Sequence, residues 1–497
     1  MTAQVYSVGQ PAPEQIVPAG VAIGVLDVDG LHLPDTPLVP IRGAIRHIGD
    51  LYAGARRHGL VQLWVTAAWA RAADLPEPAA LINAMTGKPT HLRHPFVGDA
   101  LGELHAFPEG LASWVSLDKK GEAGAGLAVA FPDYDENYTW GEGTDAGTLL
   151  TALTTYAAAV GTPYVRSPGK TGTDLMLALG RRARGGQREA VTEWPAPARE
   201  TTTVRDTVWM RTLAPAERGR AYLHSYDKNA AWLGACANVE VGLGGLEERT
   251  AANAGGAGGG VPFDPTLPGY WRARVAGAAE GWYCTPTLVR AVERGQSVAI
   301  SQAHVWTRHG RALASWYERL RDARATLYAD TTPAGRLALD VFKLTYAVTI
   351  SSLAGQWHRP DSPLYRPDWR HAILAQGAAN LSRALGRMDT AGCTPVAVNI
   401  DCVYIVSDEP DPVAACPPTI TLGTGLGHFK VHDAGVPLAP LLPAFGLRDD
   451  ARATLGVGMK RLLGLIRDTT GAEGAAGVAG AVGQDTERPS DEDGEGD

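Results

Sequence analysis

The chain has 497 residues, of which 45% are hydrophobic and 20% are charged. That length allows two or three domains with a sizeable core, and the composition is typical of a soluble globular protein. No apolar run is long enough to cross a bilayer, and Met1–Gly20 lacks the basic and apolar regions of a secretory signal. The five cysteines form no CxxC pair, which indicates neither a zinc site nor a disulfide framework. We therefore expect a reducing, cytoplasmic setting.

The net charge of −8 is concentrated at one end of the chain. The segment Asp485–Asp497 holds seven acids and one Arg, so the remainder is close to neutral. A near-neutral body can still carry a basic groove. The charge therefore neither supports nor excludes a nucleic-acid partner.

The N-terminal part predicts an α/β domain over residues 19–183, preceded by a flexible arm at 1–18. Val21–Gly30 is typical of a buried strand, and it ends in two acids at alternate positions, Asp27 and Asp29. These acids fit either a pair of metal ligands or an Asp-Gly turn, and the sequence leaves both interpretations open. The hydrophobic spacing also predicts helices around 41–58, 148–160 and 174–182, and strands around 60–66, 111–117 and 127–131.

A possible phosphate loop at Ser167–Gly172 fails the pattern, because Tyr164 occupies the position of its first glycine. We predict a turn there, leading into the helix that begins at Asp174. Residues 183–203 are rich in Arg, Pro and Glu, which indicates a linker or domain boundary.

The central region begins with a short strand that ends at Asp227 and is followed by an Ala-rich helical run. A Gly-rich loop at 253–260 comes next. Further along, the spacing predicts a strand around 304–306 and helices at 285–295, 313–328, 334–353 and 369–388.

Pro395–Val406 predicts two short apolar strands with a polar kink that contains Asp401. An acid between β-branched residues is costly to bury unless something ligates it, and a metal ion is the usual ligand partner. Asp227 is the partner acid that we propose. Two acids at strand ends, from distant segments, are what a two-Mg²⁺ phosphoryl-transfer site needs.

Four segments, in this order, resemble motifs of the family B DNA polymerases. They are Asp227–Trp232 (motif A), Lys343 to Gly355 (motif B), Asn399–Asp401 (motif C) and the Lys-bearing Gly427–Lys430. The resemblance implies an α/β multidomain fold: a right-hand polymerase palm and fingers at 204–445, then a short thumb or C-terminal helix at 446–469. The N-terminal α/β domain at 19–183 lies where the family keeps its RNase H-like, exonuclease-type domain. The tail at 470–497 is predicted to be disordered.

The resemblance also implies roles for individual residues. Asp227 and Asp401 would be catalytic and hold Mg²⁺ or Mn²⁺. The incoming nucleotide would contact Trp232, Arg324 and Lys343. Primer and template DNA would contact Lys430, Gly355 and Asn399. Asp27 and Asp29 would be the first exonuclease acids. Asp174 is a further candidate acid if the protein is a nuclease.

Several positions depart from the family pattern. Asn399 stands where motif C has its first Asp, and Ser351 and Ala354 replace the motif B Asn and Tyr. The motif B Lys aligns with Ala347, one helical turn from Lys343 on the same helix face. No later Tyr-x3-Asp exonuclease pattern can be placed, which predicts a degenerate exonuclease fold.

The sequence thus predicts a template-directed DNA polymerase of family B type that uses DNA and dNTPs and is associated with the nucleoid. A priming or terminal protein is a compatible partner, a membrane is not, and a plasmid or phage is a suitable setting. Three alternatives stay open: a catalytically degenerate DNA-binding replication protein of a mobile element, a nuclease, and a sugar- or nucleotide-modifying α/β enzyme.

Overall fold

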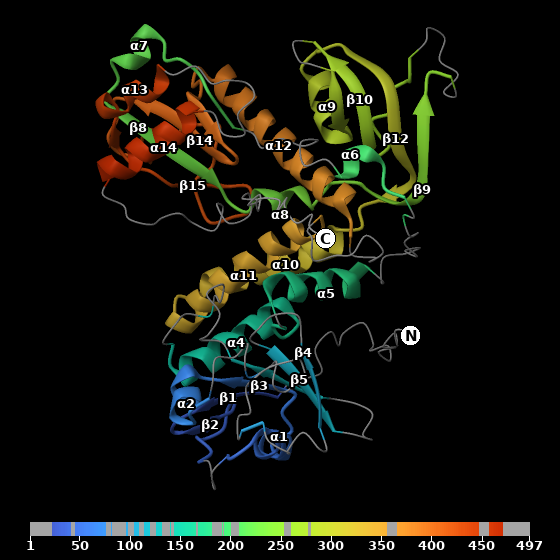
Figure 1. Cartoon of the computed structure of the whole chain (residues 1–497). Coiled ribbons are helices and arrows are strands. Elements are labelled where there is room, and N and C mark those ends of the chain that lie inside the picture. The colour runs from blue at the N-terminus through green and yellow to red at the C-terminus, as the bar shows by residue number, and fades with distance from the viewer. Residues whose placement is uncertain are drawn as a thin grey trace, which may run out of the picture. The chain divides into compact units, whose positions relative to one another are not determined.

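The chain divides into two compact units in the computed structural model (Figure 1). The N-terminal unit comprises 1–188, 236–238 and 311–349, and the C-terminal unit comprises the rest. The predicted arm, Gly355 and 471–497 of the predicted tail lie outside the described residues. The structure describes residues 22–40, 45–75, 81, 96–97, 104–108, 114–119, 126–131, 140, 144–165, 167–180, 191, 193–199, 208–252, 260–276, 280–354, 365–446 and 457–470.

A six-stranded mixed sheet forms the base of the N-terminal unit, in the order β2-β1-β3-β6-β5-β4. Strands β1, β3 and β6 are parallel, while β2 and the β4–β5 pair run antiparallel to their neighbours. All four residues Ile23–Leu26 are buried, as expected of a strand covered on both faces. The bounds are β1 Ile23–Asp27, β2 Gly30–His32, β3 Gln62–Val65, β4 Leu104–Pro108, β5 Trp114–Lys119 and β6 Leu127–Ala130. The described helices of this sheet region are α1 Ile48–Arg57, α2 Ala67–Ala72 and α4 Ala146–Val160.

Three further helices are described in this unit: α5 (Pro168–Gly180), α10 (Ala314–Ala329) and α11 (Pro333–Ser352), which belongs to it as far as Thr349. Helix α5 begins earlier than predicted, so the turn expected at Ser167–Gly172 is wrong. The Ser167 hydroxyl accepts a hydrogen bond from the Lys170 amide at 3.1 Å, and Pro168 occupies the first helical position. A Cβ at Gly172 would lie 2.0 Å from Thr349 Oγ1, so this glycine lets α5 approach α11 closely.

The C-terminal unit contains a sheet in the order β15-β8-β14-β13-β7, with β16 also paired to β8. One face packs on α12 through Tyr226, Val403 and Met388, and the other on α14 through Leu223 and Leu462. The strands are β7 Val208–Met210, β8 Tyr222–Lys228, β13 Ala397–Asn399, β14 Cys402–Ser407, β15 Phe429–Val431 and β16 Val436–Pro437. The helices are α7 Pro215–Arg218, α8 Ala231–Ala235, α12 Pro367–Thr390, η4 Ala439–Leu441, α13 Leu442–Phe445 and α14 Val457–Thr470.

A second sheet of the same unit is antiparallel, in the order β11-β10-β12-β9. Helix α9 (Thr285–Glu293) packs on it through Leu288 against Trp271 and Val305. The short helix α6 (Ala196–Arg199) precedes β7 in the sequence. The strands are β9 Val241–Thr250, β10 Gly269–Val275, β11 Gly281–Cys284 and β12 Val298–Gly310.

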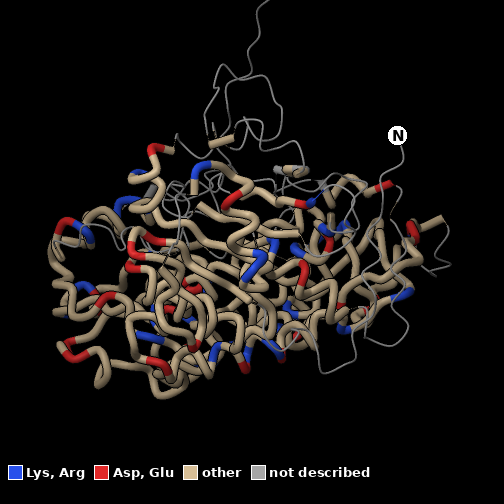
Figure 2. The backbone as a smooth tube through the Cα atoms, turned by 90° about the horizontal axis from the view of Figure 1, so that it is seen from below, with Lys and Arg blue, Asp and Glu red and all other residues tan. Residues whose placement is uncertain are grey.

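Basic and acidic residues are interspersed along the backbone of the described chain (Figure 2). Among the described helices, none combines the length and the apolar character that a bilayer span requires.

Candidate active site at the ends of β8 and β14

The hairpin between β13 and β14 places Asp401 in a two-residue loop. Asn399 pairs with Cys402 across the hairpin, so Ile400 and Asp401 form the turn. Ile400 has a φ of 60°, whereas Asp401 is not among the described residues with positive φ. That combination is typical of a type II′ turn, whose first central position favours glycine. A β-branched residue there is strained, and such strain concentrates at functional sites.

Replacing Ile400 with glycine should therefore raise the free energy of unfolding by roughly 0.5–1 kcal/mol, because glycine adopts positive φ without steric cost. Urea unfolding of the two proteins measures this difference. The control is Asn399→Gly, at a neighbouring position without positive φ. It should lower the free energy of unfolding by a similar amount. A loss of stability in Ile400→Gly would show that packing of the isoleucine outweighs the turn strain.

The two predicted catalytic acids meet at the ends of adjacent strands. Strand β14 is antiparallel to β8, with Cys402 opposite Asp227, and the Lys228 amide donates to the Asp401 carbonyl at 3.1 Å. Burial, the negative charge of Asp227 and a hydrogen bond between the two carboxyl groups raise the pKa of Asp401 to about 7. Two close carboxyl groups in a desolvated site cannot both ionise cheaply. This donor set therefore favours a bound cation.

Lys430 lies on the other side of Asp227. Strand β15 pairs with the opposite edge of β8, with Lys430 facing Asp227, and the Lys430 Nζ is 2.8 Å from Asp227 Oδ2. The Lys430 side chain is half exposed, and its charge partly offsets the rise in the pKa of Asp401. Asp227 thus lies between Asp401 at the start of β14 and the Lys430 ammonium group on β15.

A polar cluster beside this site was not found from the sequence. The Ser225 hydroxyl donates to Asp433 Oδ2 at 2.7 Å, and His432 Nδ1 is hydrogen bonded to the same oxygen at 3.0 Å. This bond to Asp433, together with the nearby Asp227 carboxylate, raises the pKa of His432. Burial alone would raise the pKa of Asp433, but its two hydrogen bonds outweigh burial and lower it. The sequence held one signal for this cluster. His432 follows Lys430 by two residues, so in an extended chain the two side chains lie on the same face of the strand.

Asn229 and Trp232 shape the turn that follows β8. The Asn229 Nδ2 donates to the Gly423 carbonyl at 2.6 Å, which fixes this turn to the loop before β15. Trp232, on α8, is half buried against α12, where a Cβ at Gly377 would lie 3.5 Å from Trp232 Cδ1. The role of Trp232 at the nucleotide sugar stays a prediction.

Arg324 and Lys343 belong to the N-terminal unit, and the structure brings them together around one ring. The Arg324 guanidinium lies 4.2 Å from the centroid of Tyr328, and Lys343 Nζ lies 5.8 Å from it. Arg324 is buried, whereas Lys343 also pairs with Asp340 at 2.8 Å. The Tyr328 ring thus brings one basic group from α10 and one from α11 to the same place.

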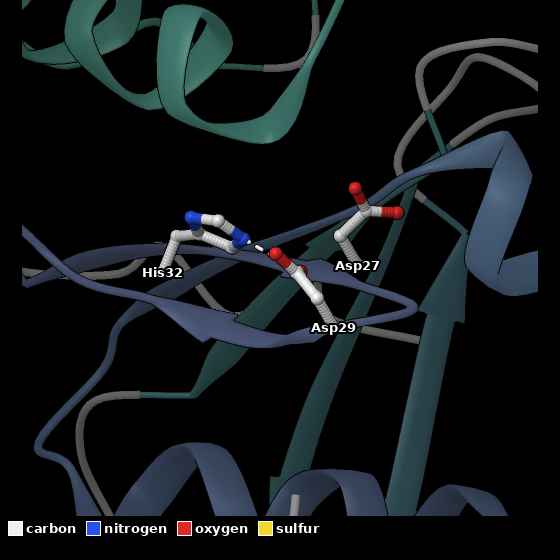
Figure 3. A group of neighbouring side chains, drawn as sticks. All are labelled: Asp27, Asp29 and His32. Atoms are coloured by element: carbon white, nitrogen blue, oxygen red, sulfur yellow. Dashed lines mark hydrogen bonds and ion pairs between the residues drawn. The ribbon is translucent and has the colours of Figure 1, made fainter. Parts of the chain in front are cut away.

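The three predicted exonuclease acids do not all come together. Asp27 and Asp29 form a group with His32 in the β1–β2 hairpin, whose candidate ligand atoms all lie within 4.8 Å of one another (Figure 3). Asp174 is not part of this group, and its carboxylate pairs with Lys170 in α5.

A scan against protein-family models found no match, and neither did a comparison with curated proteins. Solved structures of Phi29 DNA polymerase are similar over most of the chain. The binary complex with primer-template DNA matches with a TM-score of 0.43 at 9% identity, over 83% of this chain and 84% of that chain. The ternary complex with incoming nucleotide substrates gives 0.43 at 8% identity, over 82% and 84%. At these values the likeness by itself assigns no function to this chain.

Proposed function

We propose that this protein is a template-directed DNA polymerase of family B type that uses two Mg²⁺ ions. The observation that carries the proposal is the meeting of Asp227 and Asp401 at the ends of β8 and β14. A raised pKa at a desolvated acid beside a second carboxyl group is typical of a pair of metal ligands. The motif order in the sequence connects this pair to nucleotidyl transfer.

The residues of the pair fit a divalent cation, because both are carboxylates and Asp401 is largely desolvated. Bound there, Mg²⁺ or Mn²⁺ would lower the pKa of a primer 3′-OH and neutralise phosphate charge. Asp227 and Asp401 would fix the position of that charge relative to the primer end. Phosphoryl transfer asks mainly for such positioning and electrostatic stabilisation.

Lys430 has a double role in this proposal. Its ammonium group pairs with Asp227. With DNA bound, it would contact the backbone phosphate at the primer end as a point charge. Asn399, in the β13–β14 hairpin that carries Asp401, would also contact the primer or template. Trp232 would read the sugar by its shape. The sequence resemblance, and not the structure, connects Arg324 and Lys343 with the triphosphate. Template contacts would be chiefly to the backbone, and therefore salt dependent.

At the level of domains, we propose a palm built on the β8–β14 sheet and an RNase H-like N-terminal domain. The parallel β1, β3 and β6 beside an antiparallel β2 support the second assignment. Replication of a plasmid or phage, with a priming or terminal protein as partner, rests on the sequence resemblance alone.

A DNA-binding protein without catalysis is the second candidate, and Asn399 favours it, because an amide stands where motif C has an acid. Extension of a labelled primer on a short template separates the two candidates. The polymerase should extend the primer with dNTPs and Mg²⁺ or Mn²⁺ and stop in EDTA. Retained DNA binding without incorporation in either metal would establish the binding protein instead.

A further inference from the structure

Lys430 and Asp227 form an ion pair across two neighbouring strands. They lie directly opposite each other in the pairing of β15 with β8, and Lys430 Nζ is 2.8 Å from Asp227 Oδ2. The Asp227 side chain is 19% exposed, whereas that of Lys430 is 54% exposed. The charge of Asp227 raises the pKa of Asp401, and the charge of Lys430 lowers it. One ammonium group is therefore already paired with an acid that the proposed polymerase site offers to a divalent cation.

The backbone on both sides of Lys430 is held by hydrogen bonds, so its side chain is the part that can move. On one side the Asn229 amide donates to the His428 carbonyl at 2.8 Å, and on the other the His432 amide donates to the Ser225 carbonyl at 2.9 Å. A lysine side chain carries a compact charge on a flexible four-carbon stem. The ammonium group can therefore leave its carboxylate partner without a change in the strand pairing.

A divalent cation and this ammonium group compete for the same carboxylate. A cation bound at Asp227 repels the ammonium group, and the repulsion is weakly screened because the acid is largely buried. A phosphate group offers the released ammonium group a new charged partner. Binding of the cation and binding of the phosphate should therefore favour each other.

We propose that Lys430 couples divalent-cation binding at Asp227 to the binding of a DNA backbone phosphate at the primer end. The inference rests on the proposed polymerase function and adds a means of regulating that site. In free protein the ammonium group competes with the cation, and bound DNA removes this competition. Coupling between two ligands is reciprocal, so the cation must tighten DNA binding by the factor by which DNA tightens cation binding. The site would thus take up its cations mainly when a primer is present.

The test measures Mn²⁺ binding to the full-length chain by electron paramagnetic resonance, with and without a primer-template duplex. Fluorescence anisotropy of the labelled duplex measures DNA binding, with and without Mn²⁺. The part of the Mn²⁺ binding that Asp227→Asn removes reports on this site. DNA should tighten that part by roughly fivefold or more, and Mn²⁺ should tighten DNA binding by the same factor. Lys430→Gln should bind Mn²⁺ more tightly than the wild type when DNA is absent, and its coupling factor should fall to about half or less.

Lys430→Arg separates competition for the carboxylate from a general effect of charge. It keeps the positive charge, but a guanidinium group matches a carboxylate with two hydrogen bonds. Mn²⁺ should therefore bind more weakly to DNA-free Lys430→Arg than to the DNA-free wild type. Lys460→Gln is the matched control, because Lys460 is an exposed lysine on α14 of the same unit. It should leave Mn²⁺ binding in the absence of DNA unchanged.

The measurements distinguish a failure of this inference from a failure of the proposed function. Equal Mn²⁺ binding by the wild type, Asp227→Asn and Asp401→Asn, with and without DNA, would remove the proposed metal site and the coupling with it. Binding that is lost in Asp227→Asn, but is unchanged in Lys430→Gln with the same coupling factor, would overturn only the role of Lys430.

Discussion

Replacing either Asp227 or Asp401 with asparagine should lower the rate of primer extension by roughly 10³-fold or more. Metal-bound charge stabilises a phosphoryl-transfer transition state by several kcal/mol, and about 4 kcal/mol corresponds to a 10³-fold change in rate. Asparagine keeps the shape of the side chain but removes the charge that would hold the cation. Single-nucleotide incorporation under pre-steady-state conditions, with Mg²⁺ and separately with Mn²⁺, measures the loss.

The control is Asp408→Asn. Asp408 directly follows the end of β14, at the opposite end of this strand from the Asp401 turn. It is exposed and pairs with Arg220 at 2.5 Å, so the variant removes an acid from the same sheet without touching the proposed site. Its incorporation rate should stay within about twofold of the wild type, since exposed ion pairs contribute little. Wild-type rates in either of the other two variants would remove the aspartate pair from the mechanism. The double variant should lose little more than each single one, because residues that act as a unit are not additive.

The Asp401 hairpin was predictable from the sequence because its signal is local. Apolar β-branched residues on both sides of Asn399–Asp401 indicate two strands, and the polar residues between them indicate the turn. The partnership with Asp227 was not a local signal. It depends on the pairing of β8 with β14, and the sequence linked those segments only through the chemistry of paired acids and the resemblance to a family.

The polar cluster at Ser225 shows where the sequence was insufficient. Ser225 and Asp433 are far apart in the chain and meet only because the segment after β15 returns beside β8. No periodicity predicts such a contact. The start of α5 was mispredicted for the same reason. From the sequence Gly172 indicates a turn, whereas in the structure it lies inside the helix, where its small size allows close contact with Thr349.

Most of the β9–β12 sheet was also missed, for a different reason. In β10, Trp271, Ala273 and Val275 are buried while Arg272 and Arg274 are exposed, so the strand period of two is present. The strand also contains Gly269 and Ala273, however, and both residue types are depleted in strands. What decides the fold there is packing of the buried face on α9, which a single sequence does not reveal.

Without metal ions, the protein should become less stable as the pH rises from about 4 through 7. The pKa of an Asp in an unfolded chain is about 3.9, whereas burial and the neighbouring Asp227 raise the pKa of Asp401 to about 7. The folded state therefore binds more protons in this range, and the stabilisation present at low pH is lost as the pH rises. The loss is at most on the order of 4 kcal/mol before solvent screening reduces it.

Asparagine resembles the protonated acid, so Asp401→Asn should remove this pH dependence and be more stable than the wild type at pH 8 in EDTA. Urea unfolding at pH 5 and pH 8 measures both effects, with Asp408→Asn expected to follow the wild type. Adding Mg²⁺ at pH 8 should restore the stability of the wild type, because the cation takes the place of the shared proton, but not that of Asp401→Asn. Equal pH dependence in the wild type and Asp401→Asn would mean that the two carboxyl groups do not share a proton. An Asp401→Asn protein that is more stable and yet inactive would instead connect the instability of this site with its chemistry. The two negative charges that repel each other in the metal-free fold are the charges that attract the cation.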